Sequence, residues 1–300
     1  AGVVVLAQTY NDELALHFGE NIGDESYYLD VDGWYAPAMN THRTPFSGRN
    51  AEYYSEDPFL AGSMAAQEVR GVASRGMYVF VKHFAINDQE NHRGDRDGQY
   101  SLATFLNEQA AREIYLEPFE MAVKSGTVDM SYAQDNGDGT YSNATTQIPA
   151  CTGVMTSFNR IGYTWAGGNY NLITGLLRNE WGFHGFVITD NANTGVFMDA
   201  GQMIQAGADG KLTNLPTGAR YTFDKDNISD YHYGREAAHN ILYTIANSKV
   251  MNGGMPGSDY VAAVEPYQTV IYAVDAVCGV LILILVVLTV LRFRKKKQTA

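Results

Sequence analysis

The stretch WGFHGFVITDN, residues 181 to 191, is the most informative part of the sequence. Its apolar run, Phe186 to Ile188, is consistent with a fully buried β-strand bounded by polar residues. The run leads to a carboxylate, Asp190, followed by Asn191 in place of a turn glycine. In a β/α barrel, residues at the carboxyl ends of the strands point into the active-site pocket. Asp190 therefore becomes a candidate functional residue if the chain forms such a barrel.

The pattern over residues 1 to 250 favours a barrel, because short apolar runs that end in polar residues alternate with longer amphipathic segments. Repeated βα units without a glycine-rich phosphate-binding fingerprint favour a β/α barrel over a nucleotide-binding sheet. We therefore expect an α/β fold with a (β/α)8-type barrel over residues 1–250, incomplete at its N-terminal start. The expected strands are residues 33–39, 77–84, 154–158 and 186–190, and the expected helices are 11–30, 56–74, 102–124, 171–180, 198–206 and 232–248.

Two further features of this region bear on the site. Residues 127–149 are rich in Gly, Asp, Asn, Ser and Thr, which predicts a long exposed loop. His83 ends an expected strand in the same way as Asp190. For each strand-end residue, taken alone, the competing interpretation is that it caps the following helix or satisfies a loop amide.

The C-terminal part of the sequence predicts a membrane anchor. Residues 270–291 are apolar except for Asp275, and about 20 such residues span a bilayer as a helix. The cationic RFRKKK that follows marks a cytoplasmic flank. We expect a linker at 251–268, a transmembrane helix at 269–291, a cytoplasmic tail at 292–300 and an extracellular catalytic part on the cell membrane. A buried core helix is the alternative.

The composition excludes several classes of partner. The net charge is −12, so nucleic acid is not an expected partner. The two cysteines, Cys151 and Cys278, provide neither a disulfide outside the membrane nor a thiolate metal site. The acidic loops at 87–98 and 135–141 lack the pattern of a calcium loop. We therefore predict no metal and no cofactor.

Five stretches together resemble glycoside hydrolase family 3, the β-glucosidase and β-xylosidase family, and they occur in that family's order. The resemblance extends from about residue 11 to residue 253, which includes a segment, 239–253, similar to the one that closes the barrel domain in some bacterial members. The stretches are APAMNTHRTPFSGRNAEYYSEDPFLAG (36–62), VKHFAINDQENHR (81–93), EIYLEPFEMAV (113–123), GVMTSFNRIG (153–162) and LLRNEWGFHGFVITD (176–190).

The resemblance implies a retaining mechanism in which Asp190 is the nucleophile that forms a covalent glycosyl-enzyme. Lys82 and His83 match the family's KHF pair, which hydrogen-bonds the hydroxyls of the cleaved sugar, and Arg49 matches an arginine with the same role. Met155 matches a methionine that lines the pocket, although a strand methionine is equally well explained as core. Arg93 is a further candidate contact to the substrate, or a partner of Glu90 or Asp190.

The sequence also departs from the family pattern. Phe158 stands where many members carry a tyrosine whose hydroxyl reaches the nucleophile, and Asn191 stands where a tryptophan often follows it. The retaining mechanism needs a second carboxyl group as acid/base, which most members take from a separate α/β sandwich domain. We assign no acid/base within these residues and expect a sandwich domain upstream, together with the start of the barrel.

Together these features predict a membrane-anchored retaining exo-β-glycosidase that acts on terminal β-linked sugars of an oligosaccharide or glycoside. One alternative is a carbohydrate-binding surface protein without catalytic activity, because the acid is absent and Phe158 and Asn191 depart from the pattern. Another is an inactive truncated fragment.

Overall fold

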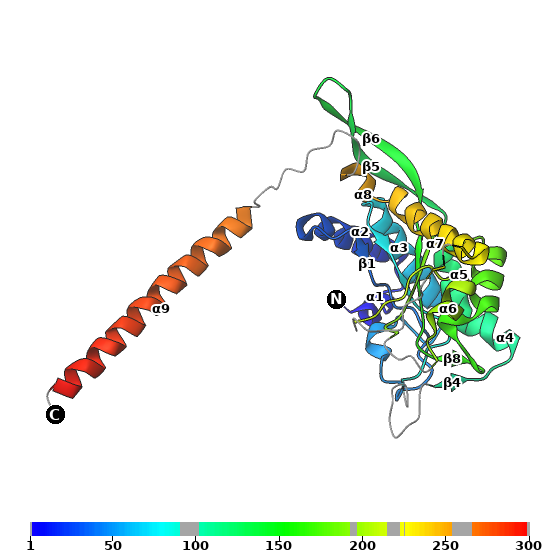
Figure 1. Cartoon of the computed structure of the whole chain (residues 1–300), viewed down its shortest axis with the longest axis horizontal. Coiled ribbons are helices and arrows are strands. Elements are labelled where there is room, and N and C mark those ends of the chain that lie inside the picture. The colour runs from blue at the N-terminus through cyan, green and yellow to red at the C-terminus, as the bar shows by residue number, and fades with distance from the viewer. Residues whose placement is uncertain are drawn as a thin grey trace. The chain divides into compact units, whose positions relative to one another are not determined.

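The computed structural model describes residues 2–90, 102–192, 197–214, 223–224, 226–253 and 266–298. The chain divides into two compact units, Ala1–Pro256 and Gly257–Ala300. The first unit contains the α/β part, and the second contains one long helix (Figure 1).

Parallel strands form the centre of the first unit. The strands β3 (Val81–Phe84), β7 (Gly153–Thr156) and β10 (Phe186–Thr189) pair in the order β10-β7-β3, and β1 (Gly33–Trp34) pairs with β2 (Tyr78–Val79). Isolated parallel bridges, Ala38 to Lys82 and Ile188 to Gly210, extend this arrangement at each side. Because all these strands are parallel, their carboxyl ends lie at one edge, which is where Asp190 follows β10.

Helices connect these strands, as the alternating pattern predicts. Their N-termini carry side-chain caps: Asn11, Asp57, Asp199 and Asn227 each accept a hydrogen bond from a backbone N–H in the first turn. The helices are α1 (Val3–Ala7), α2 (Asp12–Leu29), α3 (Pro58–Ser74), α4 (Glu108–Ala110), α5 (Glu117–Val123), α6 (Ala200–Gln205), α7 (Ile228–Ala246) and α8 (Val250–Gly253), with wide π-helical turns at Ala111–Leu116 and Asn171–Glu180 and short 3-10 turns at Asn50–Glu52 and Ala166–Gly168.

Helices α2 and α3 pack closely, because glycines stand at their contact. A Cβ atom at Gly19 would lie 2.1 Å from the carbonyl oxygen of Glu68, and one at Gly71 would lie 2.1 Å from that of Leu16. The two backbones can approach only where these side chains are absent.

Two sequence-based predictions in this unit are wrong, the helix at 102–124 and the loop at 127–149. The helix expected at 102–124 begins only at Glu108, because Asn107 caps it, and residues Ala103–Thr104 form a short strand, β4. Strand β4 pairs with β8 (Arg160–Ile161), which in turn pairs with β9 (Thr164–Trp165).

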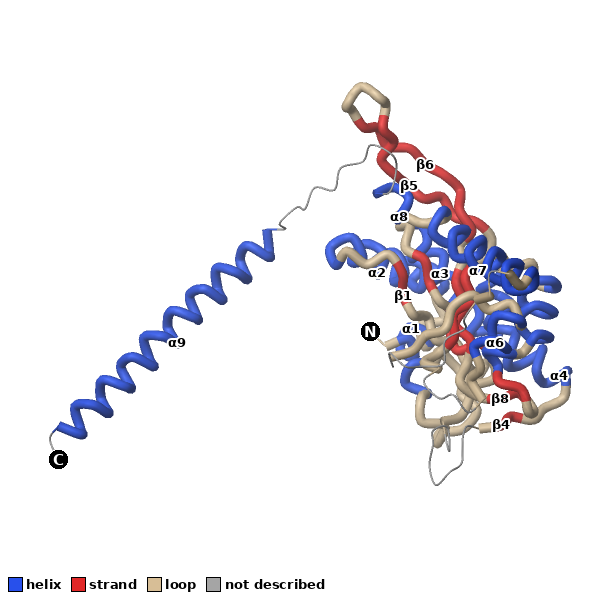
Figure 2. The backbone as a smooth tube through the Cα atoms, in the orientation of Figure 1, coloured by secondary structure: helices blue, strands red, loops and turns tan. Residues whose placement is uncertain are grey.

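Residues 127–149 form a β-hairpin instead of a loop. The strands β5 (Thr127–Asp135) and β6 (Tyr141–Pro149) pair antiparallel over nine residues each and project from the rest of the unit (Figures 1 and 2). Val128, Met130 and Ile148 are buried at the base of the hairpin, while the outer residues are polar. The Asp-Asn-Gly-Asp-Gly sequence at its tip supplies turn residues, which also account for the loop-like composition.

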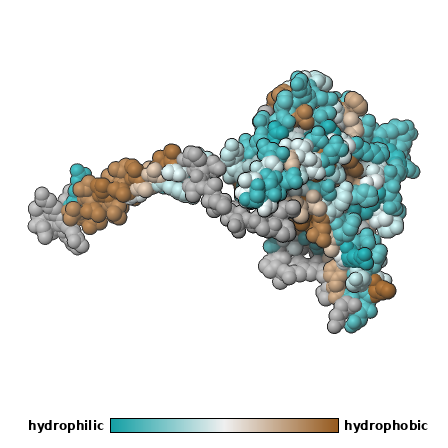
Figure 3. Space-filling view, turned by 90° about the horizontal axis from the view of Figure 1, so that it is seen from above, coloured by the Kyte–Doolittle hydropathy of each residue, from teal (hydrophilic) through white to brown (hydrophobic). Residues whose placement is uncertain are grey.

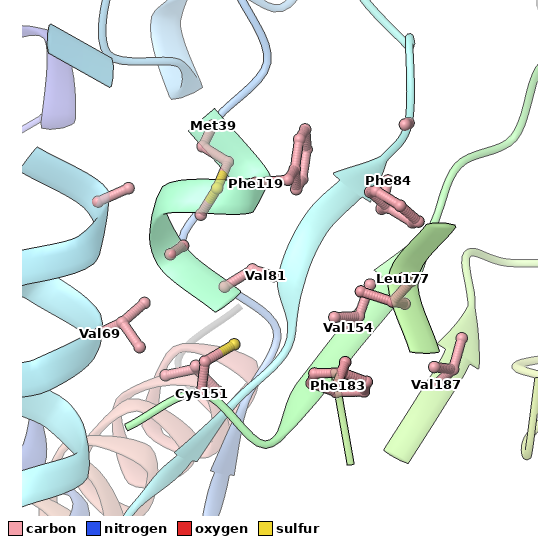
Figure 4. Close-up of a cluster of buried hydrophobic side chains, with 14 of the residues drawn as sticks. Met39, Val69, Val81, Phe84, Phe119, Cys151, Val154, Leu177, Phe183 and Val187 are labelled. Atoms are coloured by element: carbon pink, nitrogen blue, oxygen red, sulfur yellow. The ribbon is translucent and has the colours of Figure 1, made fainter. Parts of the chain in front are cut away.

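The core lies between the sheet and its surrounding helices. In Figure 4, Val81, Phe84, Val154 and Val187 from the strands and Phe119 from α5 belong to one buried cluster. Fully buried apolar side chains of this kind provide the main driving force for folding. The buried Cys151 belongs to the same cluster, and burial raises the pKa of its thiol to about 12.

One buried carboxyl group in α3 makes folding depend on pH. Glu68 has no exposed surface and accepts a hydrogen bond through Oε2 from the Tyr54 hydroxyl. Its Oε1 has no hydrogen-bond partner among the described residues. Burial raises the pKa of Glu68 to about 7, although the Tyr54 hydrogen bond opposes this effect.

The folded chain therefore binds the Glu68 proton more tightly than the unfolded chain. The tighter proton binding adds to the free energy of unfolding. This contribution is fully present below about 4.3, the pKa of a Glu side chain in the unfolded chain, and is lost as the pH rises through 7. Between pH 5.5 and pH 8.5 it falls by about 2 kcal/mol. Glu68→Gln is expected to remove that part of the pH dependence, measured by denaturant unfolding at several pH values. The exposed Glu113→Gln is the control, and an unchanged pH dependence in Glu68→Gln would contradict the assignment.

The second unit is dominated by α9 (Pro266–Gln298). Within it, the segment Tyr267–Arg292 contains an 18-residue window with a mean hydropathy of 2.9 and is long and apolar enough to cross a bilayer. Figure 3 shows apolar side chains along the described part of this helix. Length and composition alone support a membrane span, so the anchor stays a prediction.

Candidate active site

The candidate site forms where β3 and β10 end. His83 lies near the end of β3, and Asp190 directly follows β10. The Asp190 N–H donates to the carbonyl oxygen of Thr156 at 2.9 Å, so the backbone pairing with β7 continues to the position of the carboxylate. His83 Nε2 lies 3.9 Å from Asp190 Oδ2. Two side chains that are 107 positions apart in the sequence are thereby brought together.

Hydrogen bonds hold both the backbone and the imidazole of His83. Asn40 accepts from the His83 backbone N–H at 2.8 Å and donates to the His83 carbonyl at 3.1 Å. Arg49 Nη2 lies 3.0 Å from His83 Nε2. Because a guanidinium group can only donate, we infer that Nε2 is the acceptor and that Nδ1 carries the proton.

Tyr53 completes this chain of hydrogen bonds. Its hydroxyl lies 3.4 Å from His83 Nδ1 and donates to the Asn87 carbonyl, also at 3.4 Å. It therefore accepts from His83 Nδ1–H, which agrees with the inferred tautomer. Burial is the main reason that the pKa of Tyr53 is raised above its ordinary value.

Arg49 lies at the centre of the charged groups. Its Nε and Nη2 donate to the two carboxylate oxygens of Glu52, the second at 2.9 Å, and its Nη1 lies 3.2 Å from Glu90 Oε1. Burial disfavours the cation, but the Glu52 hydrogen bonds and the nearby Glu90 carboxylate outweigh this effect, so the pKa of Arg49 is raised. The two parallel hydrogen bonds to Glu52 make this pair bidentate, which fixes the guanidinium group.

Lys82 stands at the same edge. Its Nζ lies 3.9 Å from Glu52 Oε2, and 20% of its side chain is exposed. Burial lowers the pKa of Lys82, Arg49 lowers it further, and the charges of Glu52 and Asp190 oppose the shift. Glu52 thus pairs with both Arg49 and Lys82.

The remaining sequence candidates have different surroundings. Met155 is buried in a small cluster with Phe80 and Ile188, its partner in register on β10. It lies in the core, and a sugar contact by its side chain stays a prediction. Arg93 lies outside the described residues.

The two departures from the expected motif also have defined positions. Phe158 is partly buried and packs against the main core. The Asn191 N–H donates to Asp190 Oδ1 at 2.7 Å, so this residue helps to fix the carboxylate through its backbone.

Glu52 and Glu90 were not predicted as partners of Arg49. Glu52 stands three positions after Arg49, a spacing that brings side chains together within a helical turn, so it could have been found. The pairing of Glu90 with Arg49 spans 41 positions and carried no sequence signal. Over the described residues there is no group of three His, Cys, Asp or Glu side chains suited to a metal.

Comparison with known proteins connects this geometry to a family. Residues 2–212 match the model described as "Glycosyl hydrolase family 3 N terminal domain". Beta-glucosidase A of Butyrivibrio fibrisolvens is 37% identical over 186 residues, which is 62% of this chain and 19% of the relative. Beta-glucosidase B of Emericella nidulans is 36% identical over 205 residues, which is 68% of this chain and 20% of the relative. The chain thus spans about a fifth of these curated relatives.

Solved structures give the same result. Beta-glucosidase 3B from Thermotoga neapolitana in complex with alpha-D-glucose has a TM-score of 0.65 and 31% identity, over 83% of this chain and 32% of that one. A beta-glucosidase from Paenibacillus barengoltzii has a TM-score of 0.67 and 29% identity, over 88% of this chain and 27% of that one. With the family model covering more than half of its residues, the chain belongs to glycosyl hydrolase family 3.

Proposed function

We propose that the protein is a retaining exo-β-glycosidase that removes terminal β-linked glucose or a related sugar. The observation that carries this proposal is the position of Asp190, at the edge where Lys82, His83 and Arg49 converge in a family 3 chain. The relatives named above are beta-glucosidases, which supports the choice of substrate class. We also propose that the parallel strands belong to a β/α barrel, with this edge as its catalytic face.

In the first step of the proposed reaction, an Asp190 oxygen attacks the anomeric carbon and forms a glycosyl ester. The bond from that carbon to the glycosidic oxygen breaks, and the leaving oxygen takes a proton from a general acid. In the second step, water attacks the same carbon and gives its proton to the resulting base. The ester bond breaks, and the Asp190 carboxylate is restored. Two inversions leave the anomeric configuration unchanged.

The cationic residues bind the sugar in this proposal. Lys82 and Arg49 offer charge-assisted donors to hydroxyl groups, and the Glu52 and Glu90 carboxylates hold the guanidinium in place. Because Glu52 and Glu90 are engaged by Arg49, we assign neither of them as the general acid. We propose that this acid comes from a part of the protein outside residues 1 to 300.

The product's configuration is the direct test of the reaction type. Proton NMR of the full natural protein acting on an aryl β-glucoside is expected to give the β-anomer of glucose first, before mutarotation. The α-anomer as first product would contradict a nucleophilic Asp190. Tight glucose binding without any turnover would instead favour a carbohydrate-binding protein without catalytic activity.

We further propose that α9 anchors the protein in the cell membrane with the catalytic part outside. The apolar segment Tyr267–Arg292 is followed in sequence by RKKK after Phe293, a cationic flank typical of the cytoplasmic side. The protein is expected to stay in the membrane fraction after carbonate extraction, and truncation after residue 265 is expected to release it. Wild-type protein in the carbonate supernatant would contradict the anchor.

A further inference from the structure

Glu52 is the carboxylate that the two cationic residues of the site share. It ends the 3-10 turn Asn50–Glu52, three positions after Arg49. Its Oε1 accepts from Arg49 Nε, and its Oε2 accepts from Arg49 Nη2 at 2.9 Å. The same Oε2 lies 3.9 Å from Lys82 Nζ. One oxygen atom thus faces both the guanidinium and the ammonium group, so a change at Glu52 affects both cations.

Arg49 orders the Glu52 carboxylate that Lys82 meets. An ion pair between two mobile, exposed side chains contributes little, because both chains must be ordered and water screens the charges. Here the two hydrogen bonds from Arg49 already fix the carboxylate. The Lys82 side chain is 20% exposed and that of Glu52 is 39% exposed, so screening is partial. The attraction between Glu52 and Lys82 is therefore stronger than that of an ordinary surface pair.

Lys82 depends on neighbouring anions to keep its proton. Burial lowers the pKa of Lys82, and the Glu52 charge is the largest effect that opposes burial. The Arg49 charge lowers the pKa further, and the Asp190 charge raises it. The imidazole of His83, the next residue, contacts Arg49 and lies near Asp190. A Lys82 without its proton is a neutral amine, which can no longer give a sugar hydroxyl a charge-assisted hydrogen bond.

The proposed reaction removes one of the two negative charges that act on Lys82. When Asp190 forms the glycosyl ester, its carboxylate becomes neutral. Glu52 makes and breaks no bond in either step, so its charge stays the same throughout. Within the described part of the chain, Glu52 is then the carboxylate that still holds a negative charge beside Lys82.

We propose that Glu52 is a positioning residue that keeps Lys82 charged and in place for the sugar, both in the free protein and in the glycosyl-enzyme. It acts through Lys82 and does not itself react. The inference rests on the proposed function, since it assigns a role at the same site. Its first test is a binding measurement, which requires no hydrolysis.

The first experiment measures the affinity for glucose, a neutral ligand, by titration calorimetry from about pH 6 to about pH 10, below the ordinary pKa of lysine. It compares the full natural protein with Glu52→Gln, which keeps an oxygen acceptor for Arg49 and loses the charge. Glu90→Gln is the matched control, because Glu90 also pairs with Arg49 but is not among the described groups that shift the pKa of Lys82. Glu52→Asp keeps the charge on a shorter side chain.

In wild type, the affinity is expected to fall at high pH as Lys82 loses its proton. Glu52→Gln is expected to move the midpoint of this fall about one pH unit lower, the small end of the range for a nearby charge, since Glu52 is partly exposed. Glu52→Asp is expected to move it less, and Glu90→Gln is expected to weaken binding at every pH without moving it. The same midpoint in wild type and Glu52→Gln, an equal shift in Glu90→Gln or Glu52→Asp, or no glucose binding by wild type would overturn the inference.

A second measurement addresses the glycosyl-enzyme. A 2-deoxy-2-fluoroglucosyl ester on Asp190 breaks down slowly, so the recovery of activity can be followed at each pH. Glu52→Gln is expected to shift the high-pH loss of this recovery by more than it shifts glucose binding, because Asp190 is neutral in the ester. A smaller shift would contradict a role for Glu52 in the glycosyl-enzyme. If no ester forms while glucose binding shows the expected shift, the proposed reaction fails and the role of Glu52 in sugar binding stands.

Discussion

Asp190→Ala is expected to lower kcat for aryl β-glucosides on the order of 10⁴-fold, because loss of a nucleophile removes the covalent step itself. KM is expected to change far less, since Arg49 keeps its contact with His83 and Lys82 keeps its pair with Glu52, so the proposed donors to the sugar stay in place. Steady-state kinetics of the full natural protein measures both quantities. Unchanged turnover would remove Asp190 from the mechanism.

A small external nucleophile separates lost chemistry from lost folding in this variant. Azide can enter the space left by the Asp190 carboxylate and attack the anomeric carbon as the glycosidic bond breaks. The product is then a glycosyl azide of inverted configuration, formed only by Asp190→Ala. Asp129→Ala, the same chemical change on the exposed hairpin, is expected to retain wild-type kinetics. If Asp190→Ala is folded but inactive and azide does not restore turnover, the Asp190 carboxylate would have an electrostatic role only.

Arg49→Met is expected to lower kcat/KM by about 100-fold, which corresponds to about 2.7 kcal/mol. The change removes a donor to His83 and leaves the Glu52 and Glu90 carboxylates without the cation that they share. The negative charge that Arg49 no longer balances then opposes the approach of sugar hydroxyl oxygens, and His83 loses the donor to its Nε2.

Arg112→Met provides a matched control for that loss. Arg112 also pairs with two carboxylates, Glu108 and Glu180, but all three side chains are exposed on the surface. Exposed pairs contribute little to stability, so Arg112→Met is expected to keep wild-type kcat/KM. Equal losses in the two variants would show that the effect of Arg49 arises from general destabilisation.

The proximity of Asp190 and His83 could be predicted from the sequence, because both residues come at the ends of runs with the pattern of a buried strand. Each residue comes at the end of a buried apolar run, and parallel pairing through β7 brings such ends together. The side-chain caps of the main helices also depend only on neighbouring residues in the sequence, because Asn11 and Asp57 stand directly before amphipathic segments.

The hairpin and the ion-pair network could not be obtained in this way. Residues 127–149 have the polar composition of a loop because only three side chains, at the base of the hairpin, are buried. Their structure is determined by the pairing between the two strands, which the composition does not indicate. The contact between Arg49 and Glu90 depends on how two loops meet at the strand ends. The burial of Met155 with Phe80 and Ile188 likewise follows from register, not from the residue type.

The most direct measurement of the central claim is the chemical trapping of the sugar on the protein. A 2-deoxy-2-fluoro-β-glucoside with an activated leaving group slows the second step, so that the glycosyl ester accumulates. Trypsin cleavage after Arg178 and Lys211 yields a peptide of residues 179 to 211, in which Glu180, Asp190, Asp199 and Asp209 are the carboxylate side chains. Fragmentation mass spectrometry is expected to locate the fluoroglucosyl group on Asp190. A label on any other carboxylate would contradict the assignment of Asp190 as the nucleophile.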